Sequence, residues 1–387
     1  MRIIKPILFT ILLSGLLLTA CAGAQGVNTA DNIIDSNSGT APASSEQLST
    51  ISTLTSTHTI VPTSTATTTF TPVLPTATIT PSPSPTPQPL ETFASSQLRT
   101  GIVPVSYEED VCTYLENRWG EGKSEPGTIV VPIMFHSVAK PGRRITDNTT
   151  ISMEQFDYFM TKARELGFST ITTEQLIGFL NDNETIPKRS MLLIQDDRSP
   201  GVTELFMPYL EEYDWTLTLA WPTTDLTSDD IWERMENLAE TGRLDVQSHG
   251  HDHIYIQDYT PFEEVEEEIY KPIEVIEEHF GVRPKAIIWP GGNYTEESIK
   301  LAQEAGFEVG FSVFSNGPIL YNWIPLREEQ TIMDSPKMIL PRYWSTDNVV
   351  ALNHALAVSS EAQEFTESVK AEELYYYETY CLPAGSE

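Results

Sequence analysis

Two short motifs in this chain carry side chains that could hold a metal ion. The first is the pair Asp196-Asp197, which follows an apolar run at residues 191–195. Adjacent carboxylates after a buried strand are costly unless a positive partner lies beside them, and a metal ion is a natural one. The alternative is that the pair caps the next helix.

The second motif places three of the seven histidines within five residues, at His249, His251 and His253. It follows another apolar run, at residues 244–248. His249 and His253 have a spacing known for metal ligands. Two imidazoles and one carboxylate make a site with open positions for water and substrate. The alternative for the cluster, and our interpretation of the extra His251, is a surface position without a function.

Two more strand-like runs end in polar or flexible residues. Residues 286–289 lead into Pro290-Gly291-Gly292, where glycine permits a tight turn or a close backbone approach. Residues 128–135 lead into His136, which is a candidate acid if it shares an edge of the sheet with the metal ligands.

The elements that must position these residues alternate between strand and helix. Eight short apolar runs predict strands, at residues 128–135, 168–171, 191–195, 216–221, 244–248, 286–289, 309–314 and 338–344. Apolar stripes at helical spacing follow capping residues at Ser152, Ser228 and Thr295. The acidic stretch 262–280 is interpreted as a long helix with a solvated face. This alternation predicts an α/β fold, a distorted TIM-like (β/α) barrel of seven to eight units, whose reactive residues gather at the carboxyl ends of the strands.

Composition excludes several classes of protein. The 387 residues carry a net charge of −32, from 23 Lys and Arg against 55 Asp and Glu. Such a balance argues against a nucleic-acid partner and against docking on an anionic membrane through a basic face. Only three cysteines are present, which excludes a disulfide-rich miniprotein and a cysteine-rich zinc cluster.

The N-terminal quarter of the chain is not expected to fold. Residues 1–21 combine a positive start, a short apolar run and Leu18-Thr19-Ala20-Cys21, which resembles a bacterial lipobox. We expect a lipoprotein signal peptide, a lipid anchor on Cys21 and an extracytoplasmic location at the cell membrane; an ordinary signal peptide is the alternative. Residues 22–97, rich in Ser, Thr and Pro, predict a disordered stalk. The folded domain is predicted to span residues 98–387.

Two cysteines lie near the ends of the predicted domain. Cys112 and Cys381 are plausible disulfide partners in an oxidising compartment. Two independent buried thiols are the alternative.

Taken together, these motifs resemble the polysaccharide deacetylase family, the NodB-homology domains of carbohydrate esterase family 4. The resemblance rests on Asp196-Asp197, on His249 and His253, and on Pro290-Gly291-Gly292, and it covers most of residues 128–344. The early position of His136 resembles the branch with poly-N-acetylglucosamine deacetylases.

The resemblance implies a role for each of these residues. Asp197, His249 and His253 would hold a divalent metal, zinc first, with cobalt or nickel as alternatives. Asp196 would be the general base and His136 the general acid, with His354 as a weaker alternative acid. The backbone N–H of Gly291 would stabilise the oxyanion. The implied activity is removal of N-acetyl groups from a polysaccharide that contains N-acetylglucosamine, and no protein partner is implied.

The chain departs from the family pattern beside the aspartates, where Arg198 replaces a glycine and Gln195 an apolar residue. Arg198 could pair with Asp196 or contact substrate, so a weakened, glycan-binding homologue is one alternative. An O-acetyl esterase is another. The substrate candidates are peptidoglycan, an exopolysaccharide, chitin-like oligomers and acetylated xylan. Further candidates for lining a sugar groove are Trp289, Tyr294, Arg342, Tyr343 and Trp344, which could equally belong to the core.

Overall fold

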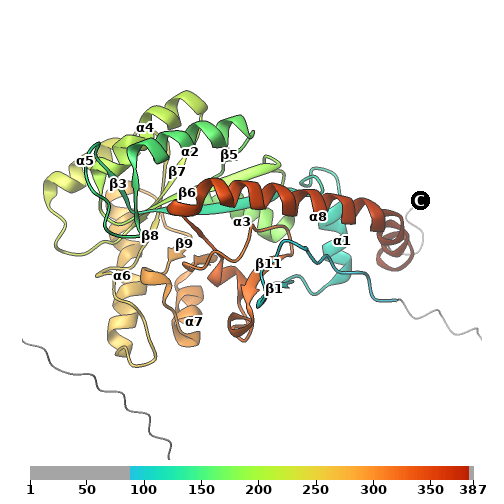
Figure 1. Ribbon diagram of the computed structural model, residues 1–387. Helices are drawn as coiled ribbons and strands as arrows, with labels where there is room; N and C mark the ends of the chain where they lie inside the picture. The colour runs from blue at the N-terminus through green and yellow to red at the C-terminus, as the bar shows by residue number, and fades with distance from the viewer. Residues whose placement is uncertain (1–87, 383–387) are drawn as a thin grey trace, which may run out of the picture. The chain divides into compact units, whose positions relative to one another are not determined.

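A curled parallel β-sheet forms the centre of the computed structural model, which describes residues 88–382 (Figure 1). Seven strands follow one another in the order β10-β9-β8-β7-β6-β2-β12, and β5 also pairs with β6. Every strand pair in this sheet is parallel. The strands are β2 (Ile129–Phe135), β5 (Ser169–Thr170), β6 (Arg189–Asp196), β7 (Leu217–Trp221), β8 (Leu244–Ser248), β9 (Ala286–Ile288), β10 (Val309–Phe311) and β12 (Tyr343–Trp344). All eight expected strands are therefore present, and the α/β prediction is confirmed.

One segment connects the two edges of the sheet. Leu340 forms a bridge with Phe311 of β10, and Tyr343 three residues later pairs with Ile133 of β2. Residues 340–344, which include β12, thus join β10 at one edge of the sheet to β2 near the other. The result is a distorted barrel rather than an open sheet.

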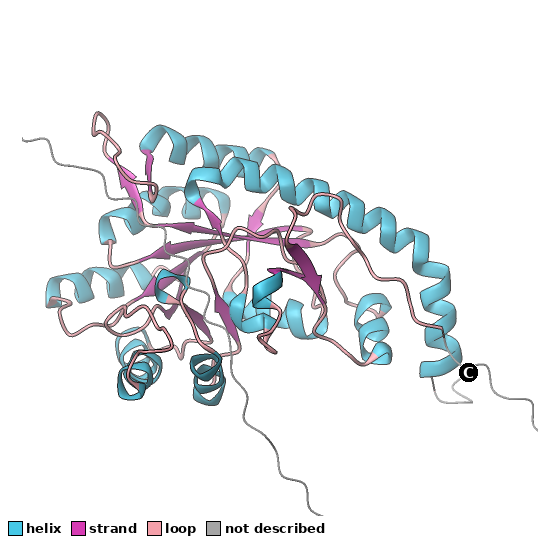
Figure 2. Cartoon of the chain, turned by 60° about the horizontal axis from the view of Figure 1, so that its bottom comes forward, coloured by secondary structure: helices cyan, strands magenta, loops and turns pink. Residues whose placement is uncertain are grey.

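Helices surround the strands, as Figures 1 and 2 show. Their bounds are α1 (Val111–Trp119), α2 (Met153–Glu165), α3 (Thr173–Asp182), α4 (Pro200–Tyr213), α5 (Asp229–Ala239), α6 (Phe262–Phe280), α7 (Glu296–Ala305) and α8 (Asn348–Tyr376). Capping boxes at Ser152 and Thr295 begin α2 and α7, as expected, whereas Ser228 makes no side-chain cap bond. The helices bury their apolar stripes against the sheet in a nearly continuous core.

Smaller elements that the sequence analysis did not anticipate lie outside the barrel. β1 (Ile102–Val105) pairs antiparallel with β11 (Ile324–Arg327), and β3 (Ser137–Ala139) pairs with β4 (Thr150–Ser152). A disulfide joins Cys112 of α1 to Cys381, beyond the end of α8. It connects parts of the chain that are 269 residues apart.

The folded unit starts earlier than the predicted boundary at residue 98. The Phe93 ring packs against Trp323 and Phe365. Ser95, Ser96 and Gln97 all hydrogen-bond to the carboxylate of Glu361 on α8. Apolar packing and these hydrogen bonds hold the last residues of the predicted stalk on the domain. Cys21 and the rest of the predicted signal peptide and stalk up to residue 87 lie outside the described residues.

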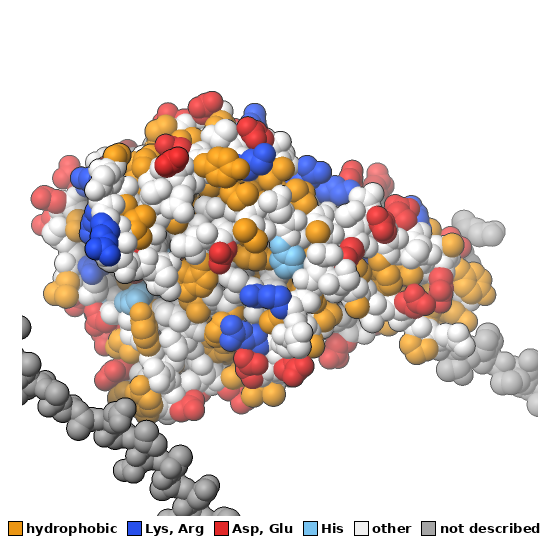
Figure 3. All heavy atoms as spheres, in the orientation of Figure 1, with side chains coloured by type: hydrophobic (Ala, Val, Ile, Leu, Met, Phe, Trp, Pro, Cys, Tyr) orange, Lys and Arg blue, Asp and Glu red, His pale blue; other side chains and the backbone are white. Residues whose placement is uncertain are grey.

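Acidic side chains are spread over the face drawn in Figure 3, and the basic ones form small groups. The net negative charge is therefore not gathered into one patch on this face. Between residues 88 and 382, no helix combines the length and apolar character needed to cross a membrane.

Candidate metal centre and active site

The two motifs meet at the carboxyl ends of β6 and β8, the two strands that lie on either side of β7. Asp196 is the last residue of β6, and Asp197 follows it. His249 comes directly after β8, and His253 lies four residues further along the same loop. Asp197, His249 and His253 are the one group of possible metal ligands found among the described residues, with ligand atoms within 4.8 Å of one another.

The three ligand atoms form a compact triangle. The two Nε2 atoms of His249 and His253 are 3.1 Å apart. Oδ1 of Asp197 lies 3.6 Å from Nε2 of His253 and 3.9 Å from Nε2 of His249. Ligands about 2.0–2.1 Å from a tetrahedral zinc ion are roughly 3.4 Å from one another. The spacing of the three side chains therefore fits such an ion.

Hydrogen bonding gives His249 the tautomer that a metal ligand needs. Its Nδ1 lies 2.6 Å from the carbonyl oxygen of Ile288, which can only accept, so Nδ1 carries the proton. Burial lowers the pKa of His249 to about 4, despite the opposing effect of Asp196, and the ring is neutral at pH 7. A neutral imidazole with a free Nε2 lone pair is the form that binds a cation.

The backbone of two candidate ligands adopts a rare conformation. Asp197 has φ of 71° and His253 has φ of 61°, in the left-handed region that non-glycine residues seldom occupy. Such conformations cost of order 1–3 kcal/mol and tend to occur at functional sites.

Asp196 is buried and paired with a cation. Nη1 of Arg342 donates to both carboxylate oxygens, at 2.7 and 2.9 Å. Nε2 of His136 lies 3.6 Å from Oδ2, and Nε2 of His249 lies 3.9 Å from the same oxygen. Burial by itself raises the pKa of Asp196, but Arg342, His249 and His136 outweigh it and bring the pKa down to about 2. Asp196 is therefore an anion at neutral pH.

His136 directly follows β2. It faces the same carboxylate, that of Asp196, to which Arg342 donates. Its ring stacks on Trp344, with ring centres 5.6 Å apart and planes 13° apart. Nδ1 of His136 is buried and has no hydrogen-bond partner among residues 88–382. Its Nε2 is thus the ring nitrogen that faces the site.

The glycine turn after β9 has the tight geometry and the close approach that were expected of it. Gly291 has φ of 59°, and a Cβ placed on it would lie 2.9 Å from ring atoms of Tyr255. The ring of Tyr255 also lies 5.5 Å from that of His253, and the side chain is 52% exposed. Tyr255 was not among the expected residues, although its place two residues after His253 was a signal for it.

Several expected groove residues belong to the interior instead. Trp289 is fully buried, and its indole N–H donates to the carbonyl of Met338. Tyr343 is buried with its hydroxyl 2.8 Å from Nδ1 of His354 on α8. Arg342 is fully buried against Asp196. The predictions of substrate contact are wrong for Trp289 and Tyr343, because each side chain has its polar group bonded inside the core. Arg342 is equally closed off from solvent, although its Nη2 has no hydrogen-bond partner among the described residues.

The remaining residues that were expected near the substrate or beside the aspartates, Tyr294, Arg198 and Gln195, all hydrogen-bond to other side chains. Tyr294 is half-buried, and its hydroxyl accepts a hydrogen bond from Gln330. Arg198 donates to Thr227 and does not pair with Asp196, so the expected role beside that carboxylate belongs to Arg342. Gln195 is buried and bonded to Thr203 and to the carbonyl of Ser199, which fixes the turn after Asp197.

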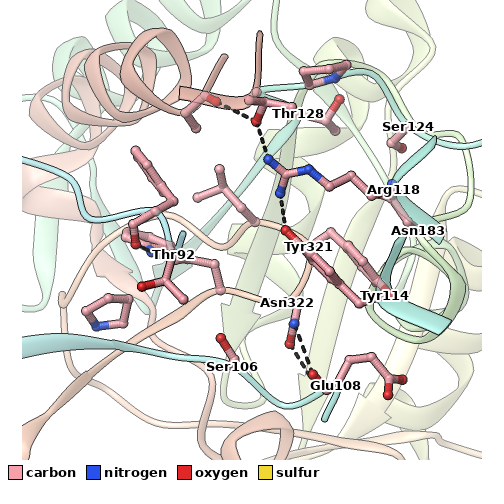
Figure 4. A pocket seen from close by; sticks show the side chains of 18 of the residues that line it. Thr92, Ser106, Glu108, Tyr114, Arg118, Ser124, Thr128, Asn183, Tyr321 and Asn322 are labelled. Carbon is pink, nitrogen blue, oxygen red and sulfur yellow. Dashed lines mark hydrogen bonds between the residues drawn. The ribbon is translucent and has the colours of Figure 1, made fainter. Parts of the chain in front are cut away.

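A cavity of about 470 Å³ lies far from these residues (Figure 4). Its lining includes Thr128, which precedes β2, whereas His136 follows β2. The cavity is therefore at the other end of that strand from the candidate active site. Within it Arg118 donates hydrogen bonds to Tyr114 and Thr366.

Comparisons with known proteins agree with the site. Residues 183–310 match the family model described as polysaccharide deacetylase. The chain contains a polysaccharide deacetylase domain. This part of the deacetylase domain holds Asp196, Asp197, both candidate histidine ligands and the glycine turn.

Individual relatives of the deacetylase domain are distant. YxkH of Bacillus subtilis (strain 168), named as a polysaccharide deacetylase, is 22% identical over 193 residues, which are 49% of this chain and 66% of that protein. The match thus spans just under two thirds of YxkH.

Solved structures with a similar fold are also distant in sequence. The Streptococcus pyogenes deacetylase PplD in complex with acetate is 16% identical, with a TM-score of 0.48 over 59% of this chain and 99% of PplD. IcaB from Ammonifex degensii is 17% identical, with a TM-score of 0.46 over 62% of this chain and 100% of IcaB.

Proposed function

We propose that this protein is a metal-dependent hydrolase that removes N-acetyl groups from an extracellular polysaccharide containing N-acetylglucosamine. The observation that carries the proposal is the meeting of Asp197, His249 and His253 beside the buried carboxylate of Asp196. Membership of the polysaccharide deacetylase family supports a hydrolytic deacetylase. The lipid anchor on Cys21 and an extracytoplasmic location remain part of the proposal, on the strength of the lipobox-like sequence.

Asp197, His249 and His253 would hold the divalent ion, with zinc as the first choice. A bound ion would polarise the acetyl carbonyl and make an attacking water more acidic. The N–H of Gly291 would donate to the oxygen that gains charge.

Asp196 and His136 would move the protons. Asp196 is ionised and would take a proton from the attacking water. A carboxylate with a pKa of about 2 holds a proton only briefly, and Nε2 of His136 is 3.6 Å away to receive it. His136 would then protonate the leaving amine.

The decisive assay is acetate release from N-acetylglucosamine oligomers by the full chain, with zinc or cobalt added and after chelation. We expect release that needs the metal and that Asp196→Asn abolishes. Asp214→Asn is the matched control, because Asp214 is exposed and caps α4 in a left-handed conformation that Asn also tolerates. Release from acetylated xylan but from no N-acetylated oligomer would replace the proposal with an O-acetyl esterase. Metal binding without release from either substrate would leave a glycan-binding homologue.

Tyr255 and Trp344 would hold the sugar ring. Tyr255 lies beside His253 and Gly291, and Trp344 stacks on His136, so the two rings flank the reacting groups. Tyr255→Ala should raise KM for the oligomers several-fold with a smaller effect on kcat. Tyr158→Ala, at a tyrosine of α2 that is 59% exposed, should leave both unchanged. Equal kinetics for both variants would remove Tyr255 from the substrate site.

A further inference from the structure

Glu268 is a buried acidic residue on a helix whose other acidic side chains are exposed to solvent. It belongs to α6, most of whose acidic residues are exposed, yet it is only 1% exposed itself. It precedes Ile269, which is buried in the core. Burying a carboxylate is costly unless hydrogen bonds satisfy it, so its partners indicate why it is there.

Those partners are backbone amides of the loop that carries both candidate histidine ligands. Oε2 of Glu268 accepts from the N–H of His251 at 3.0 Å, and Oε1 accepts from the N–H of Asp252 at 2.6 Å. The two amides lie between His249 and His253. One side chain therefore fixes the path of the chain from the first ligand to the second.

The loop is shaped around this carboxylate. Gly250 has φ of 76°, and a Cβ at that position would overlap Oε2 of Glu268. The glycine thus allows the carboxylate to approach the loop. His253, at the far end of the same turn, also has a positive φ, of 61°. The loop would not hold this conformation through local preference, because neither Gly nor His favours it strongly over alternatives.

The two ligands differ in what else holds them. His249 is buried, and both its backbone N–H and its Nδ1 are bonded to neighbouring strands, at Trp221 and Ile288. The side chain of His253 is 32% exposed. The position of His253 relative to His249 therefore depends on the loop between them.

We infer that Glu268 is a positioning residue that sets the separation of the two histidine ligands and so the metal affinity of the site. The inference rests on the proposed metal centre. Outer groups that orient metal ligands typically contribute about 10–100-fold in metal affinity.

The test compares Glu268→Gln with Glu373→Gln in the full chain. Glutamine keeps the size of glutamate but turns one acceptor into a donor that faces a backbone N–H. Glu373 is also 1% exposed, forms an ion pair with Arg118 and accepts a hydrogen bond from Trp119, but it lies on α8, away from the ligand loop. Both variants should lower Tm, so the loss of a buried carboxylate is matched.

The deciding readout is the Kd for zinc and cobalt, measured by competition with a chromophoric chelator. Glu268→Gln should raise both values by about 10–100-fold, and Glu373→Gln should leave them within twofold of wild type. Wild-type affinity in Glu268→Gln, or an equal loss in both variants, would overturn the inference.

A second readout does not depend on the metal. Hydrogen exchange at the amides of His251 and Asp252 should be slow in the wild type and faster in Glu268→Gln without metal. If the wild-type chain binds neither ion, the proposed function fails, and this exchange result alone decides whether Glu268 holds the loop. Unchanged exchange at both amides would refute that role.

Discussion

Replacing Arg342 with Met should lower the stability of the protein and change the titration and activity of the site. Arg342 is fully buried, donates to both oxygens of Asp196, and donates through Nε to the carbonyl of Ser312 at 2.8 Å. Met fills much of the same volume but leaves Asp196 as a buried anion without its cation. Removing one partner of a buried ion pair costs about 3–5 kcal/mol. We expect a loss of that size in the free energy of unfolding.

The same substitution should change the titration of Asp196. With Arg342 gone, burial becomes the dominant influence on its pKa, which should rise from about 2 to above the ordinary 3.8. The acidic limb of the pH–activity profile should therefore move to higher pH. Activity at neutral pH should fall as well, because the carboxylate loses the contact that orients it.

Denaturant unfolding of Asp196→Asn, Arg342→Met and the double variant would measure the coupling energy between Asp196 and Arg342. Asp196→Asn combined with Arg342→Met leaves no unpaired charge, so the double variant should lose about 1–3 kcal/mol less than the sum of the single losses. Losses that add within about 0.5 kcal/mol, or an Arg342→Met variant as stable as wild type, would refute the argument from charge pairing. The result also bears on the catalytic assay, since Asp196→Asn must be shown to be folded before its activity is interpreted.

Three further predictions concern the disulfide, the ligand loop and the N-terminal edge of the domain. Cys112→Ser should lower the free energy of unfolding by about 2–5 kcal/mol, because the disulfide closes a very long loop. The wild type should lose the same amount when a reductant is added. Equal Tm values of the wild type with and without reductant would contradict this. Gly250→Ala should weaken zinc binding and lower Tm, whereas Gly242→Ala, with a similar φ of 72° but open space around it, should lower Tm slightly and leave zinc affinity unchanged. The pKa of Glu361 is about 2 rather than 4.5, because hydrogen bonds from the segment 95–97 outweigh the opposing effect of burial. A lowered pKa gives stability that is present above pH 4.5 and is lost as the pH falls towards 2, so wild-type Tm should fall more steeply over that interval than the Tm of Glu361→Gln; parallel melting curves would count against it.

The strands and the metal ligands could be predicted because their signals are local. Each strand of the sheet is a short apolar run, and a parallel sheet brings the residues after such runs to one edge. Asp197, His249 and His253 therefore meet although they are distant in sequence. The capping boxes at Ser152 and Thr295 are equally local, and both are present.

The partners of the buried polar groups could not be predicted, because they depend on distant contacts. Nothing near Arg342 in the sequence indicates a carboxylate 146 residues away. Glu268 has the same neighbours as the exposed acidic residues of α6, and only the amides of another loop distinguish it. Trp289 was misjudged for a related reason, since its place at the end of a strand does not show whether its ring faces a groove or the core.

The closing segment of the barrel has a consequence for the order of folding. A chain is synthesised from its N-terminus, so β6 and its terminal carboxylate exist well before the segment 340–344 that supplies their cation. Until Arg342 arrives, closing the interior around Asp196 would leave a buried carboxylate without its cation, and such a group either stays hydrated or takes up a proton. Early compact states should therefore keep the mouth of the barrel hydrated or hold Asp196 in its protonated form. Dehydration of the active site and completion of the sheet should occur in the same late step, observable as concurrent loss of solvent access at β6 and protection of β12 amides during refolding.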